Sequence, residues 1–456
     1  MSDPRDDLRD FLARLERCGA LRRVGMKVDP VLEIAAITER VCKRPGGGPA
    51  LCFSAVLGHD APVLTNLFGS AERMAWALGA AHLEEVAGRL ARDLALAGEG
   101  PASDRLRRLT EAQAWRPLMR TSALCREREP APDLRRLPAL QGWPGDGGRF
   151  LTLPLIFTRD AETGRLNCGM YRMQIFDART AALHWGDGSD GARHARSWAA
   201  RGERMPVVVA LGGDPALIYA AAAPLPSAVE ESAFAGYLRG AAVEMIASRD
   251  GALPVPATAE FVLEGYVAPG EVRPEGPFGN HTGFYAPPAP APVFHLEHLT
   301  CRRQPLYPCT VVGPPPMENL NFVLASETIF LPLLQIDFPE ILAIHFIPQG
   351  AFHGCALIAV QPAVAGKGLE LIRRLWETPF FRRSRLLITV DDGVDLHAGD
   401  AVLWRLVNQI DADRDLVVSA GRLGIDGTGK IDRALVTGDP AVARRVAERW
   451  ADYGID

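Results

Sequence analysis

Residues 151–158, LTLPLIFT, begin a series of short apolar runs that decides the fold of this chain. Four further runs follow, at 168–176 (CGMYRMQIF), 205–212 (MPVVVALG), 260–267 (EFVLEGYV) and 292–301 (PVFHLEHLTC). Glycine, proline and aspartate separate them, and short apolar or alternating runs between such residues are typical of β-strands. The middle of the chain is therefore predicted to be a β-rich domain, a barrel or a sandwich. One helix, predicted at 228–246, interrupts it.

On both sides of this region the pattern changes to a mixture of helices and strands. Before it, helices are predicted at 6–18, 32–41 and 71–78, with strands near 51–53 and 63–67. A segment rich in Leu, Ala, Arg and Glu (82–114) then predicts a helical connector, and the proline-rich stretch at 130–148 marks a boundary. After the β-rich region, helices are predicted at 327–334, 369–376, 401–409 and 441–453, with a buried strand at 386–390.

These patterns predict an α+β protein of mixed α/β and β character with three domains. A chain of 456 residues is too long for one ordinary core, because a domain usually has roughly 100–200 residues. The predicted units are an N-terminal α/β domain with its connector (1–110), a central β-rich domain (111–305) and a C-terminal α/β domain (306–456).

Composition and charge exclude several classes of function. Hydrophobic residues make up 48% of the chain and charged residues 23%, which is typical of a soluble globular protein. The formal net charge of -5 gives no general attraction for nucleic acid or an anionic membrane. The N-terminus lacks the apolar core of a secretion signal, and no uninterrupted apolar run is long enough to span a bilayer. A cytoplasmic location is expected, with the eight dispersed cysteines as reduced core thiols.

Two segments carry polar residues where an ordinary strand or turn would not need them. In NCGMYRMQIF (167–176), strand alternation places Asn167 and Tyr171 on one face and Arg172 on the other. In PEGPFGNHTGFY (274–285), glycines and prolines favour a tight loop around Glu275 and His281. A strand and a loop that border a polar cleft would explain both segments. From the residues alone, a structural arginine paired with an acid and a surface turn remain the simpler interpretations.

Taken in order, the segments of this chain resemble the UbiD family of decarboxylases. The resemblance covers nearly the whole chain, and the joint order and spacing of its motifs make it specific. It rests on NCGMYR (167–172), HWGDGSDGARH (184–194), RMPVVVALGGDPALIYAAAAPLP (204–226), EESAFAGYLRG (230–240), VPATAEFVLEGYV (255–267), PEGPFGNHTGFY (274–285), YPCTVVGPPPMEN (307–319), LLITVDDGVDLH (386–397) and LGIDGTGK (423–430).

The resemblance implies a split β-barrel flavin-binding central domain and a C-terminal domain that mediates oligomerisation. The family binds prenylated FMN through a divalent metal, usually manganese and otherwise magnesium, with a nearby potassium ion. Asn167 and Glu231 match its metal-ligand positions, and their oxygens suit such hard cations. The cofactor-lining positions are matched by Met170, Tyr171, Arg172, His184, Trp185 and Gly186, and Arg385 stands where the family often has a phosphate-binding basic residue.

The family's catalytic trio is an arginine, a glutamate and a second acid. Arg172 and Glu275 match the first two, and Asn280 stands in the place of the second acid. A side-chain amide cannot act as a general acid at neutral pH. Three interpretations follow, in order of preference. A neighbour such as His281 or Glu275, or a bound water, delivers the proton; a group of the substrate assists; or the chain is a poorly active relative.

Two further departures concern cofactor binding. Relatives often carry a basic residue where Ser189 or Asp190 stands, and Asp190 near a phosphate is unfavourable unless a metal screens it. The lysine often found before VPATAEF is also absent, and Arg249 is its possible substitute.

The leading function is a reversible, non-oxidative decarboxylation of an aromatic, heteroaromatic or α,β-unsaturated carboxylic acid, and carboxylation is the same reaction in reverse. The alternatives are a non-catalytic or weakly active flavin-binding subunit that needs a partner chain, and a flavin reductase-like oxidoreductase. The implied partners are the small carboxylic acid and a flavin prenyltransferase that supplies the cofactor, without nucleic acid or membrane. A homodimer or homohexamer is expected, with the apolar runs TIFLPLLQI (328–336) and EILAIHFI (340–347) as one possible surface or as core.

Overall fold

The apolar runs of the middle region form one curled, half-barrel sheet in the computed structural model, which describes residues 7–429 and 438–455. The order of its eight strands is β5-β8-β9-β16-β13-β10-β6-β7. This sheet confirms the predicted split-barrel character of the central domain. Its strands are β5 (Phe150–Leu151), β6 (Pro154–Arg159), β7 (Leu166–Met170), β8 (Met173–Ile175), β9 (Thr180–Leu183), β10 (Met205–Leu211), β13 (Phe261–Glu275) and β16 (Ala289–Cys301).

Strand β10 shows why these runs are apolar on both faces of the sheet. It pairs antiparallel with β13 on one side and with β6 on the other. Val207 and Val209 belong to one hydrophobic core, whereas Val208 and Ala210 belong to another. Because successive strand residues point to opposite faces, a continuous apolar run fits a strand covered on both sides. The helices of this region are α6 (Asp190–Ala200), α7 (Pro215–Ala220) and α8 (Glu231–Arg239).

The helix predicted at 228–246 is shorter in the structure. Helix α8 ends at Gly240, which adopts a left-handed backbone conformation with a φ of 74°. Such a glycine commonly terminates a helix. Residues Glu244–Ala247 then form strand β11, which pairs with β12 (Pro254–Pro256) and β4 (Leu118–Met119). The apolar residues beyond Gly240 fitted a helical stripe, but they belong to this small sheet.

The N-terminal region forms a four-stranded sheet in the order β1-β2-β3-β17. Its last strand, β17, comes from residues that follow the central sheet in the chain. The amphipathic segment at the start is helix α1, with Leu8, Phe11, Leu12 and Leu15 buried as predicted. The elements are α1 (Leu8–Arg17), β1 (Leu21–Val28), α2 (Glu33–Cys42), β2 (Ala50–Val56), β3 (Val63–Thr65), α3 (Ala71–Ala77), α4 (Leu83–Leu96), α5 (Ala102–Thr110) and β17 (Tyr307–Pro308).

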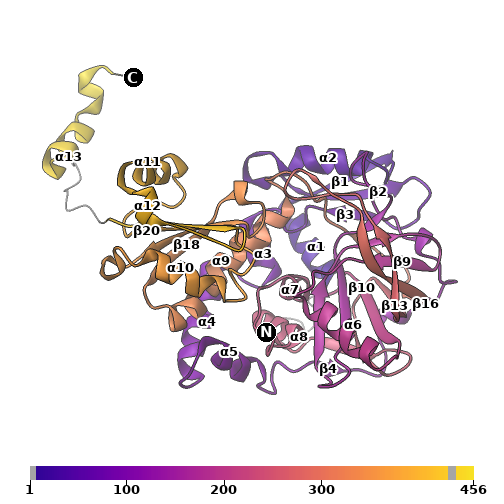
Figure 1. Cartoon of the computed structure of the whole chain (residues 1–456). Coiled ribbons are helices and arrows are strands. Elements are labelled where there is room, and N and C mark those ends of the chain that lie inside the picture. The colour runs from indigo at the N-terminus through magenta and orange to yellow at the C-terminus, as the bar shows by residue number, and fades with distance from the viewer. Residues whose placement is uncertain (1–6, 430–437, 456) are drawn as a thin grey trace.

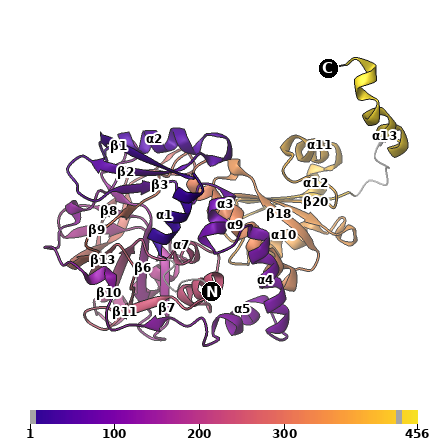
Figure 2. The ribbon, with the colours of Figure 1, turned by 180° about the vertical axis from the view of Figure 1, so that it is seen from behind.

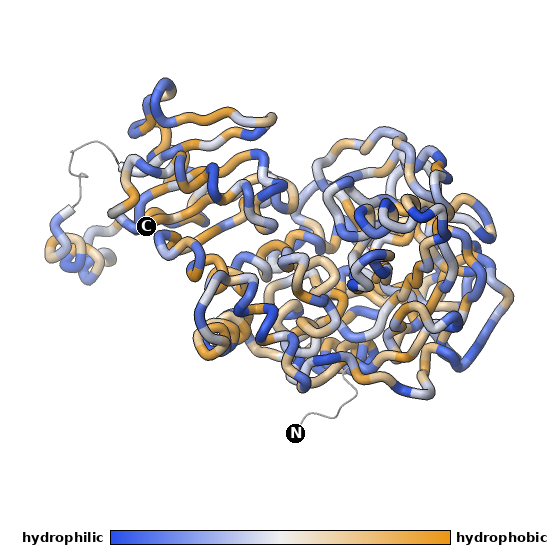
Figure 3. The backbone as a smooth tube through the Cα atoms, turned by 60° about the horizontal axis from the view of Figure 1, so that its bottom comes forward, coloured by the Kyte–Doolittle hydropathy of each residue, from blue (hydrophilic) through white to orange (hydrophobic). Residues whose placement is uncertain are grey.

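The C-terminal region forms a five-stranded sheet in the order β18-β19-β20-β22-β21, beside the central domain (Figure 1). Its strands carry mainly hydrophobic residues (Figure 3), and helices α10 and α11 contribute to the cores on its two faces. The elements are α9 (Glu318–Asp337), β18 (Ile341–Phe346), β19 (Cys355–Val360), α10 (Gly368–Trp376), β20 (Leu386–Asp391), α11 (Gly399–Gln409), α12 (Ala412–Asp415), β21 (Leu416–Ser419), β22 (Arg422–Gly427) and α13 (Pro440–Glu448).

Helix α9 lies where the C-terminal region meets the N-terminal helices, and it packs against α3, α4 and α5 (Figure 2). It is longer than the predicted 327–334 and, by length and composition alone, could cross a membrane. Half of its most apolar window is buried inside the protein, together with the carboxylates of Glu318 and Glu327. About half of the residues in the runs 328–336 and 340–347 are buried and the others are half-buried, so both runs contribute mainly to the core. The domain boundaries at 110 and 305 stay a prediction.

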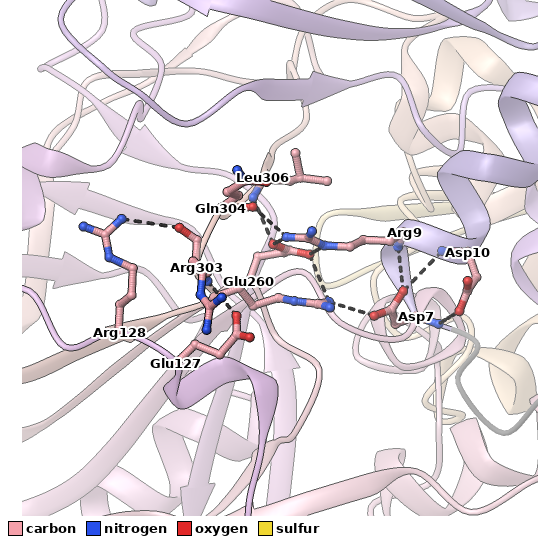
Figure 4. Close-up of polar contacts among 10 residues, drawn as sticks. Asp7, Arg9, Asp10, Glu127, Arg128, Glu260, Arg303, Gln304 and Leu306 are labelled. Atoms are coloured by element: carbon pink, nitrogen blue, oxygen red, sulfur yellow. Dashed lines mark hydrogen bonds and ion pairs between the residues drawn. The ribbon is translucent and has the colours of Figure 1, made fainter.

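A buried ion network ties helix α1 to the central sheet (Figure 4). Glu260, which is fully buried, accepts hydrogen bonds from Arg9 Nε and Nη2 at 2.9 Å each and from the amide of Leu306 at 2.9 Å. Arg302 Nη1 lies 3.3 Å from Glu260 Oε1 and donates to Asp7 Oδ2 at 2.7 Å. Two guanidinium groups from distant parts of the chain thus share one buried carboxylate.

Replacing Glu260 by glutamine is expected to lower the free energy of unfolding by about 3 kcal/mol, because breaking a buried ion pair leaves uncompensated charge. Urea denaturation of the two proteins measures this difference. The matched control is Glu16→Gln, since Glu16 pairs with Arg23 at 2.9 Å on the surface, where solvent screens the interaction. Equal losses in the two variants would contradict the assigned role of the Glu260 network.

Candidate active site

Arg172, Glu275 and His184 meet at the ends of three elements of the central sheet. Arg172 lies between β7 and β8, Glu275 is the last residue of β13, and His184 follows β9. Arg172 donates through Nε and Nη2 to the two oxygens of Glu275, at 2.8 and 3.0 Å. His184 Nδ1 lies 2.9 Å from Glu275 Oε2, and the backbone amide of His184 donates to the Arg172 carbonyl at 3.0 Å.

This arrangement fixes the guanidinium in one orientation. The bidentate pair uses two of the five N–H donors of Arg172, and the guanidinium carbon lies over the ring of Phe278, 4.3 Å from the ring centroid. Glu275 is fully buried, whereas the Arg172 side chain keeps a small exposed fraction. An arginine held in this way keeps further donors for a carboxylate or a cofactor.

The pKa of Glu275 follows from its two partners. Burial by itself raises the pKa, but the hydrogen bonds from His184 and Arg172, together with their charges, lower it to about 2. Glu275 is therefore a carboxylate at neutral pH. It orients Arg172 and cannot supply a proton, which removes it from the candidates for the missing acid.

This low pKa predicts a pH-dependent contribution to stability. The native pKa lies below the ordinary value of 4.5, so the stabilisation is complete above that pH and is lost as the pH falls towards 2. The advantage of the wild type over Glu275→Gln in free energy of unfolding should shrink by roughly 3 kcal/mol across this window. Denaturant titrations at stepped pH measure it. A difference that does not change with pH would contradict the prediction.

The loop after Glu275 is anchored to the sheet and to the segment before it. The amide of Gly276 donates to Gln174 Oε1 and that of Gly279 to Asp146 Oδ1, at 2.7 Å each. Asn280 uses its own side-chain oxygen locally, because Oδ1 accepts from the amide of His281 at 2.7 Å.

His281 faces the C-terminal domain across this loop. Its ring centroid lies 5.6 Å from that of Phe352. Burial, followed by the positive charges of Arg172 and Arg383, lowers the pKa of His281 below its ordinary value. The imidazole is therefore neutral at pH 7, with one N–H left to donate.

A cavity between the central and C-terminal domains lies beside this cluster. The central domain contributes both predicted metal ligands, Asn167 and Glu231, together with the predicted cofactor-lining residues Met170 and Tyr171. The C-terminal domain contributes its opposite wall, which the sequence did not predict: Phe352, His353, Pro379, Phe380, Arg382 and Arg383. Asn167 and Tyr171 both line this cavity, but β7 ends at Met170, which lines the cavity as well, so the predicted strand alternation does not account for their shared location.

The position of the Tyr171 ring explains why residue 169 of the motif NCGMYR is glycine. Its ring packs edge-on against Trp185, with centroids 5.9 Å apart, and its hydroxyl accepts from the amide of Gly191 at 3.4 Å. A Cβ atom at Gly169 would lie 2.3 Å from the Tyr171 ring. Any larger residue at position 169 would therefore clash with the Tyr171 ring.

Glu231 has the environment of a cation ligand. Burial raises its pKa to about 8, and the charges of Asp190 and Glu230 act in the same direction. Its Oε2 accepts a hydrogen bond from the amide of Cys168 at 3.0 Å. The buried Asn167 lines the same cavity, so the two side chains fit a divalent cation whose remaining ligands come from phosphate or water. Within residues 7–429 and 438–455, no group of three or more His, Cys, Asp and Glu side chains forms a metal site.

Three predicted cofactor-binding residues, Trp185, Gly186 and Arg385, do not line this cavity. Trp185 packs against Tyr171 but lines a separate groove with Trp198 on α6, and Gly186 forms a turn that accepts from the amide of Ser189 at 2.8 Å. Arg385 is exposed before β20 and is not among the residues that line the cavity; Arg382 and Arg383 line it instead.

His353 is a cavity residue that the sequence gave no reason to single out. It lies among the rings of Phe346, Phe352 and Phe380, and its Nε2 is buried without a hydrogen-bond partner. Burial, with the nearby Arg383 and His281, lowers its pKa to about 3, so this imidazole is neutral. Its signal in the sequence was only a histidine in a loop, which most often is structural.

Comparisons with known proteins follow the same domain order. Three family models of 3-octaprenyl-4-hydroxybenzoate carboxy-lyase match the chain: the N-terminal domain at residues 12–90, the Rift-related domain at 116–315 and the C-terminal domain at 321–426. An uncharacterized protein of Archaeoglobus fulgidus is 41% identical over 93% of this chain and 92% of its own length. One of Aquifex aeolicus is 35% identical over 99% of both chains.

Two solved structures show the same fold over almost the full length. The closed form of vanillic acid decarboxylase from Sedimentibacter hydroxybenzoicus matches with a TM-score of 0.86 at 23% identity, covering 100% of both chains. An evolved dimeric form of the UbiD-class enzyme HmfF from Pelotomaculum thermopropionicum, in complex with prFMN, matches with a TM-score of 0.81 at 26% identity. That match covers 98% of this chain and 100% of the other.

Proposed function

Because the chain belongs to the UbiD family, we propose that it is a carboxy-lyase that uses prenylated FMN to decarboxylate an aromatic, heteroaromatic or α,β-unsaturated carboxylic acid. The observation that carries this proposal is the Arg172–Glu275 pair, which is bidentate, buried and close to the cavity that holds Asn167 and Glu231. A structural neighbour of the same class contains prFMN, which supports the choice of cofactor.

The residues of the cavity would hold the cofactor in two ways. Asn167 and Glu231 would bind manganese or magnesium, and the metal in turn the phosphate, while potassium stays a prediction from the family. Arg382 and Arg383, which line the cavity, are better placed than Arg385 to bind phosphate from the C-terminal side. When bound, prenylated FMN would supply the electron sink that loss of carbon dioxide requires.

Arg172 would bind the carboxylate of the substrate, because its guanidinium is held in place and planar. Glu275 would keep that guanidinium charged and aligned. Neutral His281 is the nearest replacement for the absent acid at position 280, either donating its N–H or holding a water that delivers the proton. The reverse reaction, carboxylation, would use the same contacts.

The partners and the location of the enzyme follow from the same proposal. A flavin prenyltransferase would supply the cofactor, and the only other partner needed for turnover is the small acid. We keep the expectation of a cytoplasmic homo-oligomer that binds neither nucleic acid nor membrane.

The test is a substrate screen with the chain produced together with a flavin prenyltransferase. Carbon dioxide release and the decarboxylated product are measured for a panel of benzoic, furoic, pyrrole and acrylic acids. Release with at least one acid supports the proposal, and none above the level of protein made with unmodified FMN would contradict it. If His281→Ala turns over as fast as the wild type, His281 is not the proton source, and a bound water or a group of the substrate delivers the proton instead.

The same preparations separate the alternative functions. A flavin reductase would oxidise a nicotinamide cofactor without releasing carbon dioxide. A non-catalytic subunit would bind the prenylated flavin yet stay inactive until a partner chain is added.

A further inference from the structure

A separate cavity, with a volume of about 620 Å³, is lined by residues from three distant parts of the chain. They come from α5 and the segment after it, from the hairpin of β6 and β7, and from the start of α8. None of the described residues lines both this cavity and the one that contains Asn167 and Glu231. Its volume is in the usual range for a small-molecule site. We call it the arginine cavity, after four of its lining residues: Arg107, Arg116, Arg159 and Arg165.

Two of these arginines are held in place by backbone carbonyls. The half-buried Arg159 donates from Nε to the carbonyl of Ala252 at 3.0 Å and from Nη1 to the carbonyl of Gly164 at 2.9 Å. Arg116 donates from Nε to the carbonyl of Glu111 at 3.0 Å. Neither forms an ion pair with a carboxylate in residues 7–429 and 438–455. Because a carbonyl orients a guanidinium without cancelling its charge, both arginines keep terminal donors for a ligand.

The other charged residues of the lining leave an excess of positive charge. The exposed side chain of Arg165 forms no hydrogen bond or ion pair with any residue that the structure describes. Arg107 pairs with Glu111 at 3.0 Å, but this pair is exposed and screened by solvent. Glu230, the second acid of the lining, accepts a hydrogen bond from the hydroxyl of Ser232. Four guanidinium groups against two carboxylates give the cavity a potential that attracts anions.

The remaining lining is mainly apolar. Val229 and Ala233 are buried, and Pro117 and Leu166 are half-buried beside the same cavity. A bare inorganic anion would leave these side chains in contact with water. A ligand with a carbon skeleton would cover them, and this combination of an apolar surface with a few charged groups is typical of a small-molecule site.

We propose that the arginine cavity binds a small organic molecule with at least two anionic groups, either phosphates or carboxylates. A guanidinium presents two parallel N–H donors, which match two oxygens of either group. Because the arginines come from separate parts of the chain, a single anionic group would leave some of them without a partner. The site does not depend on the proposed flavin chemistry, since its lining residues are different.

Isothermal titration calorimetry on the full chain tests this proposal, with fructose 1,6-bisphosphate as the phosphate probe and adipate as the carboxylate probe. Both solutions contain FMN and manganese in excess, so that the arginines of the flavin cavity are occupied. At least one probe should bind with a dissociation constant below about 1 mM. The uncharged counterparts, fructose and adipamide, should not bind. The probe that binds more tightly identifies the anionic group.

Three variants locate the binding. Arg165→Gln should weaken it about tenfold or more and keep the wild-type Tm, because Arg165 forms no contact that stabilises the fold. Arg159→Gln should weaken it by a similar factor. The control Arg108→Gln should not, because Arg108 on the same helix α5 donates to the carbonyls of Ala97 and Glu99 and lies outside the cavity.

Four results would overturn the proposal. They are no binding of either charged probe, equal binding of the uncharged counterparts, unchanged affinity in Arg165→Gln or Arg159→Gln, and an equal loss of affinity in Arg108→Gln. The last result would mean that general surface charge, and not the arginine cavity, attracts the probe.

Discussion

Replacing Arg172 by lysine is expected to lower the decarboxylation rate by at least about 100-fold while the chain remains folded and flavin-bound. Lysine keeps the positive charge, but it cannot form the two parallel bonds to Glu275 at 2.8 and 3.0 Å. The guanidinium carbon also lies 4.3 Å from the centroid of the Phe278 ring, a contact that a lysine ammonium does not reproduce. The loss should appear in kcat/KM for any acid that the wild type accepts.

The matched control for this change is Arg273→Lys. Arg273 also lies over a phenylalanine, with its guanidinium carbon 4.0 Å from the centroid of Phe176, but it is exposed and outside the site. This variant should keep the wild-type rate. A small loss in Arg172→Lys, of the same size as in the control, would mean that positive charge alone is sufficient and that the bidentate geometry has no catalytic role.

Replacing Glu231 by glutamine is expected to weaken metal-dependent flavin binding by about 100-fold. The reason lies in charge. Glu231 is buried beside the acidic Asp190 and Glu230, which raises its pKa to about 8, and a divalent cation would displace its proton and bind the carboxylate together with the flavin phosphate. The glutamine amide removes most of the attraction for the cation. The dissociation constant of FMN, measured by fluorescence with and without manganese, gives the effect.

FMN binding without metal is a second measurement on the same variant. In the presence of a chelator at pH 7, Glu231→Gln should bind FMN about as well as the wild type, because burial raises the pKa of Glu231 to about 8 and the metal-free side chain is then mainly protonated and neutral, like the amide. Glu230→Gln is the control, since Glu230 is the preceding residue and does not line this cavity. If manganese strengthened FMN binding equally in the wild type and in Glu231→Gln, Glu231 would not be a metal ligand.

Much of the central sheet could be predicted from the sequence because its strands are marked locally. MPVVVAL is apolar at every position, so both faces of the strand are apolar. It forms β10, which pairs with an antiparallel strand on each side. In NCGMYR the alternation predicted to place Asn167 and Tyr171 on one face does not extend that far, because β7 ends at Met170, although both residues line the cavity. Local patterns fail where one residue changes the backbone, as at Gly240, which ends α8 and turns an apparent helical stripe into a strand.

The composition of the site was less accessible to sequence reasoning, because its parts are far apart in the chain. Arg172 and Glu275 are 103 residues apart, and only the resemblance to a family placed them together before the structure did. The wall formed by Phe352, His353 and Arg383 depends on how the C-terminal domain packs against the central one, which no local spacing encodes. For the same reason Arg385, chosen by its place in the sequence, lies outside the cavity that Arg383 lines.

A crystal structure of the chain with FMN and manganese tests the location of the flavin most directly. The phosphate and the metal should lie beside Asn167 and Glu231, with the ring system extending past Tyr171 towards Arg172. A flavin bound in the groove between Trp185 and Trp198, with no metal at Asn167 and Glu231, would contradict the proposed flavin site.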